Sequence, residues 1–117
     1  VSEYPDMQEL LCTADMLITD YSSAMWDYSF LYRPCFLFVP DFEEYMTNRG
    51  FYTDPYSWGF PICKTNEELI DAIRFFNQSQ IVAAMNKHHD NFESYEKGVA
   101  TQKISEIISN TVNDIAK

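Results

Sequence analysis

The sequence predicts an α/β fold, a parallel sheet flanked by helices with a helical C-terminal end. Two short apolar runs, residues 16–18 (MLI) and 35–39 (CFLFV), are typical of strands buried on both faces. Between them, apolar side chains recur at helical spacing from Ser22 or Ser23 to Tyr32. Strand, helix and strand with short connections form a βαβ unit, which implies parallel pairing and a right-handed crossover.

The flanking sequence predicts where further helices begin and end. A helix of about two turns begins at Asp6, just after a proline. The helix of the βαβ unit ends before Pro34, because a proline disfavours helical geometry in the residue that precedes it. A short helix over residues 42–50 ends at Gly50, a residue that readily adopts the left-handed conformation of a helix C-terminus.

The second half of the chain is predicted to be mostly helical. An aromatic, irregular loop with a short strand at residues 61–63 precedes a capping box made by Thr65 and Glu68. Two more helices cover residues 80–91 and 100–115. The helix after the capping box has one apolar face, formed by Leu69, Ile70, Ile73 and Phe76. With 117 residues and no repeat, linker or low-complexity tract, the chain makes one domain or part of one.

The charge of the chain limits the partners that it can bind. It carries 8 lysines and arginines against 18 aspartates and glutamates, a net charge of −10. A surface for nucleic acid or for an anionic membrane is not expected in this segment alone, because such surfaces need clustered cations. A small phosphorylated ligand remains possible, since helix N-termini bind anions through backbone amides.

The cysteines, the hydropathy and the first residue predict the compartment of the protein and whether the segment is part of a longer chain. Cys12, Cys35 and Cys63 lie far apart and lack metal-ligand spacing, so we expect reduced thiols that act as small core side chains. No run is long enough to span a bilayer and no leader is present, which predicts a cytoplasmic location. Because the first residue is Val1 rather than methionine, we expect the segment to belong to a longer protein.

The candidate site lies at the end of the first predicted strand. Ser22 and Ser23 start a helix whose first N–H groups have no partner within the helix, so two hydroxyls and several amides can donate to phosphate oxygens. Asp27, one turn deeper on the same face, suits the hydroxyls of a ribose or polyol. An ordinary helix cap explains the same serines, and a turn of the Asx type explains Asp20.

Several other residues have two interpretations each. Arg49 could clamp a phosphate or form a surface ion pair with Glu43 or Glu44. Lys64, which precedes the capped helix, is expected to be solvated. His88 and His89 are adjacent in a polar helix, so both cannot face one ligand, and a solvated surface is expected. The aromatic cluster of the loop is interpreted as a small core of its own rather than a stacking platform; its members are Phe51, Tyr52, Tyr56, Trp58 and Phe60.

The sequence as a whole resembles a known family. The stretches ADMLITDYSSAMWDYSFLYRPCFLFVPDFEEY, RGFYTDP and KTNEELIDAI are similar to the C-terminal part of the CDP-glycerol glycerophosphotransferases, the teichoic-acid primases and polymerases. The resemblance continues weakly through FESYEKGVATQKISEII and so covers most of the chain. Its core is TDYSS at residues 19–23, together with Asp27 and the RGFY stretch at residues 49–52.

The resemblance implies both a fold and an activity. Family members have a GT-B architecture of two Rossmann-like domains, and residues 1–117 would be the distal part of the C-terminal, donor-binding one. Ser22 and Ser23 would contact the donor phosphates, and Asp27 a hydroxyl of CDP-glycerol; Asp20 and Arg49 are further candidates. The parent enzyme, peripheral on the inner face of the cell membrane, would transfer glycerol phosphate to a growing polymer or a lipid-linked primer with release of CMP. No metal or cofactor is expected.

Two features depart from the family pattern. The family's catalytic histidines lie upstream, so His88 and His89 do not take their role, and this segment alone is expected to be inactive. Where many relatives carry an adjacent Gly-Pro, Phe60 stands between Gly59 and Pro61.

Three alternatives to this family remain open from the sequence. A different GT-B transferase, using a CDP-polyol or a nucleotide sugar, would share the fold and the phosphate site. A receiver-type signalling domain would use Asp20 as its phospho-acceptor, although the required acidic pair and five alternating strands are not found. A non-catalytic fragment would dock a partner through its acidic helices.

Overall fold

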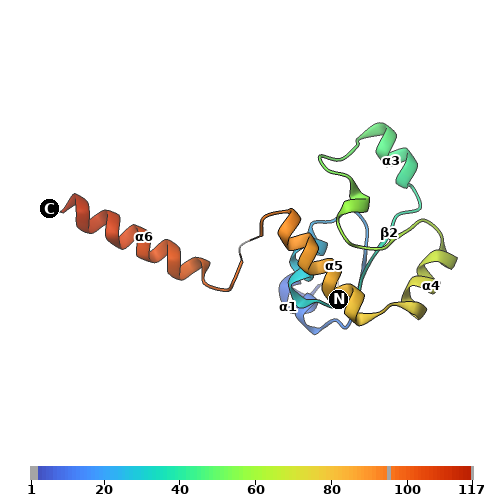
Figure 1. The fold of residues 1–117 in the computed structure, drawn as a ribbon, viewed down its shortest axis with the longest axis horizontal. Coiled ribbons are helices and arrows are strands. Elements are labelled where there is room, and N and C mark those ends of the chain that lie inside the picture. The colour runs from blue at the N-terminus through green and yellow to red at the C-terminus, as the bar shows by residue number, and fades with distance from the viewer. Residues whose placement is uncertain (1–2, 95, 117) are drawn as a thin grey trace.

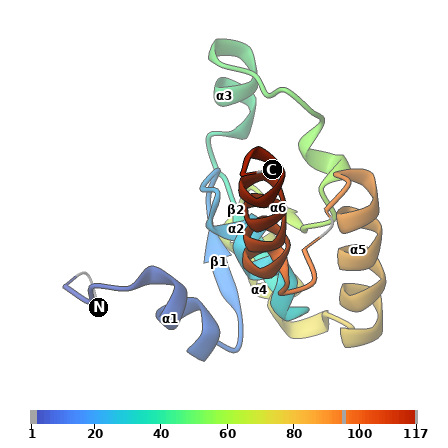
Figure 2. The same cartoon turned by 90° about the vertical axis from the view of Figure 1, so that its left-hand side faces the viewer.

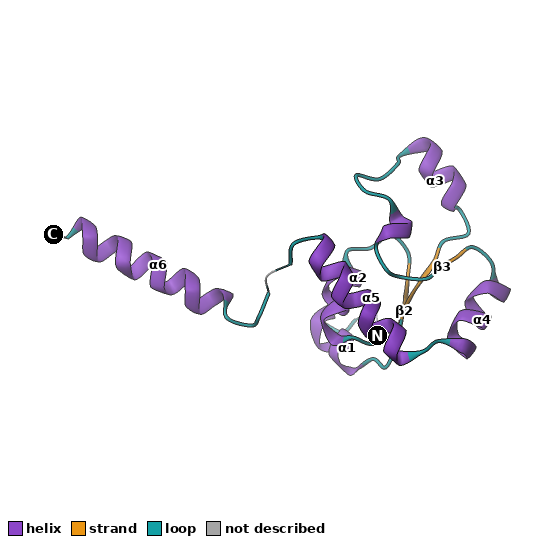
Figure 3. Cartoon of the chain, in the orientation of Figure 1, coloured by secondary structure: helices purple, strands orange, loops and turns teal. Residues whose placement is uncertain are grey.

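The computed structural model describes residues 3–94 and 96–116, and its centre is a parallel sheet of three strands (Figure 3). The strand order is β1 (Leu17–Thr19), β2 (Cys35–Phe38) and β3 (Ile62–Cys63). Leu17 pairs with Cys35 in the first ladder, and Leu37 pairs with Ile62 in the second. A parallel sheet flanked by helices confirms the predicted α/β fold.

Except for the last one, the helices lie around this sheet, in the order that the sequence predicts (Figure 1). Asp6 caps the first one, because its Oδ1 accepts the N–H groups of Gln8 and Glu9 at 2.9 and 3.3 Å. The α-helices are α1 (Met7–Thr13), α2 (Ala24–Tyr28), α3 (Phe42–Asn48), α4 (Asn66–Phe75), α5 (Gln78–Asn91) and α6 (Ala100–Ile115). Two short 3₁₀ helices, Ser29–Leu31 and Pro55–Ser57, complete the described elements.

The βαβ unit differs from the prediction in two details. The first strand was expected to be buried on both faces, but Ile18 is 46% exposed because β1 lies at the edge of the sheet. The predicted long helix is a short α2 that tightens into the 3₁₀ turn, after which Tyr32 adopts a left-handed conformation with φ 54°. Proline at position 34 does follow the end of the helix, as predicted.

The core forms where the central strand β2 meets α2 and the aromatic loop. Phe36 and Leu37 are each 1% exposed, and Tyr28 is fully buried with its hydroxyl donating to the Ala14 carbonyl at 2.8 Å. Cys35 and Cys63 are buried as predicted, and burial raises the pKa of the Cys35 thiol to about 12.

The core prediction is wrong for one of the three cysteines. Cys12 is exposed, because Leu11 is the residue of α1 that is buried in the core.

The later elements follow their predicted caps. Gly50 ends α3 at φ 69°. The N–H of Glu68 donates to Thr65 Oγ1 at 3.2 Å, while the Glu68 carboxylate accepts the N–H of Lys64 instead of that of Thr65. Asn77 caps α5, which therefore begins at Gln78 rather than at residue 80.

The two apolar helix faces differ in their burial. On α4, Leu69 and Ile73 are half-buried, whereas Ile70 and Phe76 of the same predicted face are exposed. Helix α6 extends away from the rest of the described chain (Figures 1 and 2), and its apolar residues, Ile104, Ile107, Ile108, Val112 and Ile115, are all exposed. Within the residues that the structure describes, no helix combines the length and the apolarity that crossing a bilayer would take.

Candidate functional site

The carboxyl ends of β1 and β2 lie together, as expected for a ligand-binding edge of a parallel sheet. Tyr21 follows β1 and Asp41 follows β2. The Tyr21 hydroxyl donates to Asp41 Oδ1 at 3.0 Å. The Tyr21 ring stacks on Tyr45 at a centroid distance of 3.9 Å and contacts Phe51 at 5.4 Å. The stretch after α3 therefore folds back over the strand ends. Burial, followed by the hydrogen bond to Asp41, raises the pKa of Tyr21, which keeps the phenol protonated as a donor.

The turn before α2 brings its polar side chains onto the surface. Asp20 Oδ1 accepts the N–H of Ser22 at 3.1 Å, and Ser22 Oγ accepts the N–H of Ala24 at 3.2 Å. Both serines are exposed, and among the described residues Ser23, the N-cap, makes no capping bond through its side chain. Asp20 therefore forms the expected turn and Ser22 the expected helix cap. The hydroxyl of Ser23 stays available at the ligand edge.

Asp27 faces a cavity of about 400 Å³ between α1 and α2. This cavity is lined by Gln8 and Cys12 of α1, by Asp27 itself, and by Glu96 from the segment before α6. Two carboxylates therefore stand around it. Such groups accept hydrogen bonds from hydroxyls and repel phosphates.

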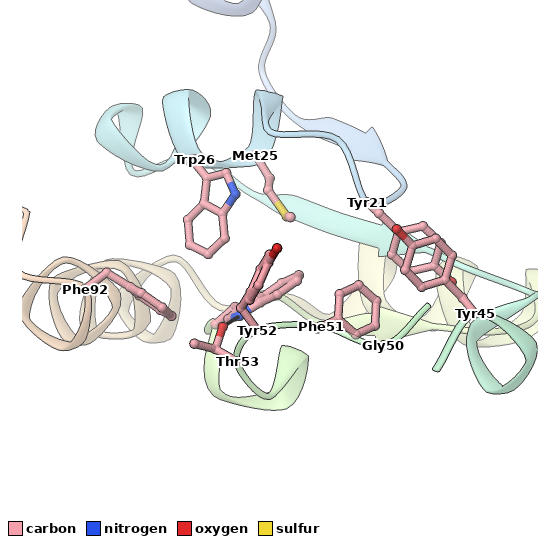
Figure 4. A pocket seen from close by; sticks show the side chains of 10 residues that line it. Tyr21, Met25, Trp26, Tyr45, Gly50, Phe51, Tyr52, Thr53 and Phe92 are labelled. Atoms are coloured by element: carbon pink, nitrogen blue, oxygen red, sulfur yellow. Dashed lines mark hydrogen bonds between the residues drawn. The ribbon is translucent and has the colours of Figure 1, made fainter. Parts of the chain in front are cut away.

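A second cavity, of about 440 Å³, lies on the other flank of α2 and is mostly aromatic (Figure 4). We call it the aromatic pocket. Trp26 and Met25 of α2 line one side and Tyr52 of the loop lines the other, with Phe92 at one end and Tyr21 near the strand ends. None of the described residues that line it carries a charge.

The loop's aromatic cluster is divided between core and surface. Trp58 and Phe60, each 5% exposed, belong to the main core together with Met25 of α2, so the prediction of a separate core for the loop is wrong. Phe60, the residue between Gly59 and Pro61, packs edge-on against Trp26 at 6.4 Å. Gly59 has φ 91°, and a Cβ there would lie 3.1 Å from the Ala84 carbonyl oxygen, so the loop passes close to α5.

The two exposed tyrosines of that cluster do not belong to the core, which corrects the prediction for them. Tyr52 is fully exposed, with its ring at the aromatic pocket. Tyr56 is 62% exposed and meets the Phe42 ring edge-on at 5.5 Å.

The two cations of this region have different partners. The Arg49 guanidinium lies 5.7 Å from the centre of the Tyr45 ring, and among the described residues it forms no ion pair with Glu43 or Glu44. Lys64 was expected to be solvated, but its Nζ pairs with Glu43 Oε1 at 2.6 Å and lies 4.6 Å from the Phe42 ring centre. Because Lys64 takes Glu43, Arg49 remains exposed beside the loop.

The prediction that both histidines lie on a solvated surface is wrong. His88 is 3% exposed and stacks on Trp26 at 4.7 Å, and its Nδ1 has no hydrogen-bond partner among the described residues. His89 is half-buried against Phe30, with Nε2 2.9 Å from Ser29 Oγ. The reason is that α5 lies against the aromatic face of α2. No group of three or more His, Cys, Asp or Glu side chains in the described chain could hold a metal ion.

The buried histidine makes stability depend on pH. Burial lowers the pKa of His88 below its ordinary 6.5, in spite of a hydrogen bond to the Trp58 backbone that raises it, and burial also lowers the pKa of His89. Below pH 6.5 the unfolded chain therefore binds more protons than the folded one, so the free energy of unfolding falls as the pH falls. We expect the melting temperature to decrease between pH 7.5 and 5.5, and the slope to be smaller in His88→Phe. Parallel slopes for the two proteins would contradict this.

Comparison with known proteins gives consistent matches. The family model for CDP-Glycerol:Poly(glycerophosphate) glycerophosphotransferase matches residues 1–110. The chain is 38% identical over 107 residues to the teichoic acid poly(glycerol phosphate) polymerase of Bacillus subtilis (strain 168), covering 88% of this chain and 14% of the relative. It is 35% identical over 112 residues to the teichoic acid glycerol-phosphate transferase of Staphylococcus aureus (strain NCTC 8325 / PS 47), covering 92% and 29%.

Solved structures agree with the sequence matches. The wall teichoic acid polymerase TagF superposes with a TM-score of 0.78 at 34% identity, covering 100% of this chain and 29% of that one. A variant of TagF soaked with CDPG superposes with a TM-score of 0.75 at the same 34% identity, covering 100% and 30%. The chain thus spans less than a third of the length of each of these proteins.

Proposed function

The chain belongs to the CDP-glycerol:poly(glycerophosphate) glycerophosphotransferase family, and from this membership we propose that residues 1–117 are the distal part of a GT-B donor-binding domain. In the proposed enzyme, the hydroxyls of Ser22 and Ser23 donate to the phosphates of CDP-glycerol. Asp27 accepts a hydrogen bond from a hydroxyl of the same donor. Asp20 supports the site through its bond to the N–H of Ser22.

One observation carries this proposal: two exposed serines stand where the chain leaves β1 and enters α2, at the ligand edge of the sheet. A phosphate there meets two exposed hydroxyl donors. The backbone amides that the sequence suggested as further donors are already taken, because the N–H groups of Ala24, Met25 and Trp26 donate within the turn. The chain also superposes on the structure of a TagF variant that was soaked with CDPG. This similarity supports a nucleotide-linked glycerol as the donor.

The proposed reaction is a phosphoryl transfer. A hydroxyl oxygen of the acceptor forms a bond to the phosphorus that bears glycerol, and the bond from that phosphorus to the bridging oxygen breaks. CMP leaves with the electron pair, and the hydroxyl proton passes to a general base outside this segment. The acceptor is a teichoic-acid-type polymer or a lipid-linked primer, which would place the enzyme on the inner face of the cell membrane. Absence of the enzyme from sedimented membranes would contradict that location.

Asp27→Asn tests the hydroxyl contact. Because hydrogen bonds to charged groups contribute roughly 1.5–3 kcal/mol, we expect the Kd for CDP-glycerol to rise about tenfold or more. Isothermal titration calorimetry on the enzyme that contains this segment measures it. Glu67→Gln, which removes an exposed carboxylate from the first turn of α4, is the matched control. An unchanged Kd in Asp27→Asn would remove the hydroxyl role.

A related donor is the second candidate, because the phosphate site would serve any nucleoside diphosphate. Competition among CDP-glycerol, CDP-ribitol and a UDP-sugar separates the possibilities. Preference for either competitor would keep the phosphate site and replace the donor.

A further inference from the structure

We propose that the aromatic pocket binds the hydroxyl-bearing end of the acceptor, an anionic chain of glycerol phosphate units, with Arg49 pairing with one of its phosphates. This inference rests on the proposed function, since it names the second substrate of the same site.

The two cavities beside α2 differ in charge. Asp27 and Glu96 line the cavity that faces α1, so an anionic chain entering it would meet two carboxylates. The aromatic pocket has no charged side chain among its described lining residues. On a chain of net charge −10, this difference directs a polyanion to the aromatic pocket and leaves the other cavity to the uncharged hydroxyls of the donor's nucleoside.

The walls of the aromatic pocket suit a hydroxylated carbon chain. Trp26 and Tyr52 face it from opposite sides, with Tyr52 fully exposed and its hydroxyl directed into the space between them (Figure 4). Ring faces pack against C–H groups, and a phenolic hydroxyl can both donate to and accept from glycerol hydroxyls. Ligand pockets commonly combine such apolar walls with a few polar groups.

Arg49 extends this surface with a positive charge. Gly50, Phe51 and Tyr52 line both the aromatic pocket and an adjoining hollow that Arg49 completes. The guanidinium is exposed and is not held by Glu43, which pairs with Lys64. A phosphate of the chain can therefore accept two hydrogen bonds from Arg49 while the terminal glycerol lies between Trp26 and Tyr52.

The proposed donor site lies where a hydroxyl bound in the aromatic pocket could attack the donor phosphorus. Ser22 and Ser23 lie in the chain between Tyr21 and Met25, which both line the aromatic pocket, so the proposed phosphate site is next to this pocket although neither serine is among its described lining residues. In phosphoryl transfer the attacking and leaving oxygens lie roughly in line through phosphorus. If the nucleoside of the leaving CMP occupies the flank of Asp27, the attacking hydroxyl arrives from the opposite flank, where the aromatic pocket lies.

Calorimetric titrations of the enzyme with synthetic tri(glycerol phosphate) and, separately, with CMP test the inference. Tyr52→Ala is expected to weaken the binding of the trimer about fivefold. Arg49→Gln is expected to weaken it about tenfold, with an effect that shrinks at high salt. Tyr52→Phe should keep most of the affinity, because it keeps the ring. CMP affinity should stay within about twofold in all three variants.

Two substitutions at other exposed sites serve as controls. Tyr4→Ala and Arg74→Gln remove a similar exposed side chain elsewhere, in the N-terminal segment and in α4, and should leave both ligands unaffected. Failure of the trimer to bind, or binding that is equal in wild type, Tyr52→Ala and Arg49→Gln, would overturn the inference. Loss of CMP affinity in Tyr52→Ala would also overturn it, since the pocket would then hold the donor. An enzyme that binds the trimer but neither CMP nor CDP-glycerol would instead refute the proposed function.

Discussion

Replacing Ser22 and Ser23 together by alanine is expected to lower kcat/KM for glycerol phosphate transfer by at least about tenfold, because each charge-assisted hydrogen bond to phosphate contributes roughly 1.5–3 kcal/mol. The measurement is steady-state transfer from CDP-glycerol by the enzyme that contains this segment. Both side chains are exposed, so the loss should come from the ligand and not from the core.

Removing the Ser22 hydroxyl also costs stability, and this loss has to be separated from the effect on ligand binding. Ser22 Oγ accepts the N–H of Ala24, and losing such a cap costs about 1 kcal/mol of stability. A melting temperature measured on each variant shows whether the protein remains folded at the assay temperature. Ser23→Ala alone keeps the cap, because the side chain of Ser23 takes no part in it among the described residues.

Ser22→Asp tests the phosphate contact by adding a negative charge while keeping the cap. A carboxylate at this position can accept the same N–H of Ala24, so the turn and α2 should persist. Its negative charge would repel the donor phosphates, so transfer should fall at least as far as in the double alanine variant. If Ser22→Asp and the double alanine variant both retain wild-type kcat/KM, the serines hold no phosphate and only start the helix.

Local sequence signals were sufficient for most of the fold. The continuous apolar run at residues 35–39 predicted β2, and the Thr65–Glu68 spacing and the periodicity of residues 100–115 predicted helices that the structure contains. These signals are local because caps and amphipathic faces act over one or two turns. Burial of β1 was predicted wrongly, since a strand's place at the edge of a sheet depends on which other strands pair with it.

The candidate site was predictable in its position but not in its surroundings. The turn at residues 19–23 could be placed at the ligand edge from the order of the strands alone. The histidines were misassigned because the partner of His88 is Trp26, 62 positions earlier in the chain. The cavity that Asp27 faces also depends on Gln8 and Glu96, which come from distant segments. Contacts between residues so far apart arise from tertiary packing, which periodicity does not encode.

Trp58→Ala is expected to have the largest effect on stability, a loss of about 3–5 kcal/mol in the free energy of unfolding. Trp58 is 5% exposed, its ring lies 5.2 Å from that of Trp26 and 5.5 Å from that of Phe51, and its Nε1 donates to Thr53 Oγ1 at 2.8 Å. Truncation would leave a cavity between α2 and the loop and would release the hydroxyl that the indole holds. Urea unfolding measures the change.

Two variants of the same region separate packing from the hydrogen bond. Trp58→Phe keeps a ring against Trp26 but removes the donor to Thr53, so we expect it to cost only about 1–2 kcal/mol. Tyr52→Ala removes a fully exposed ring and should change the free energy of unfolding by no more than about 0.5 kcal/mol. This order follows from burial: Trp58 fixes the loop to the core, so that Tyr52 can remain exposed at the pocket. If Tyr52→Ala destabilised the protein as much as Trp58→Ala, Tyr52 would be part of the core, and the loop would not be free to receive a ligand.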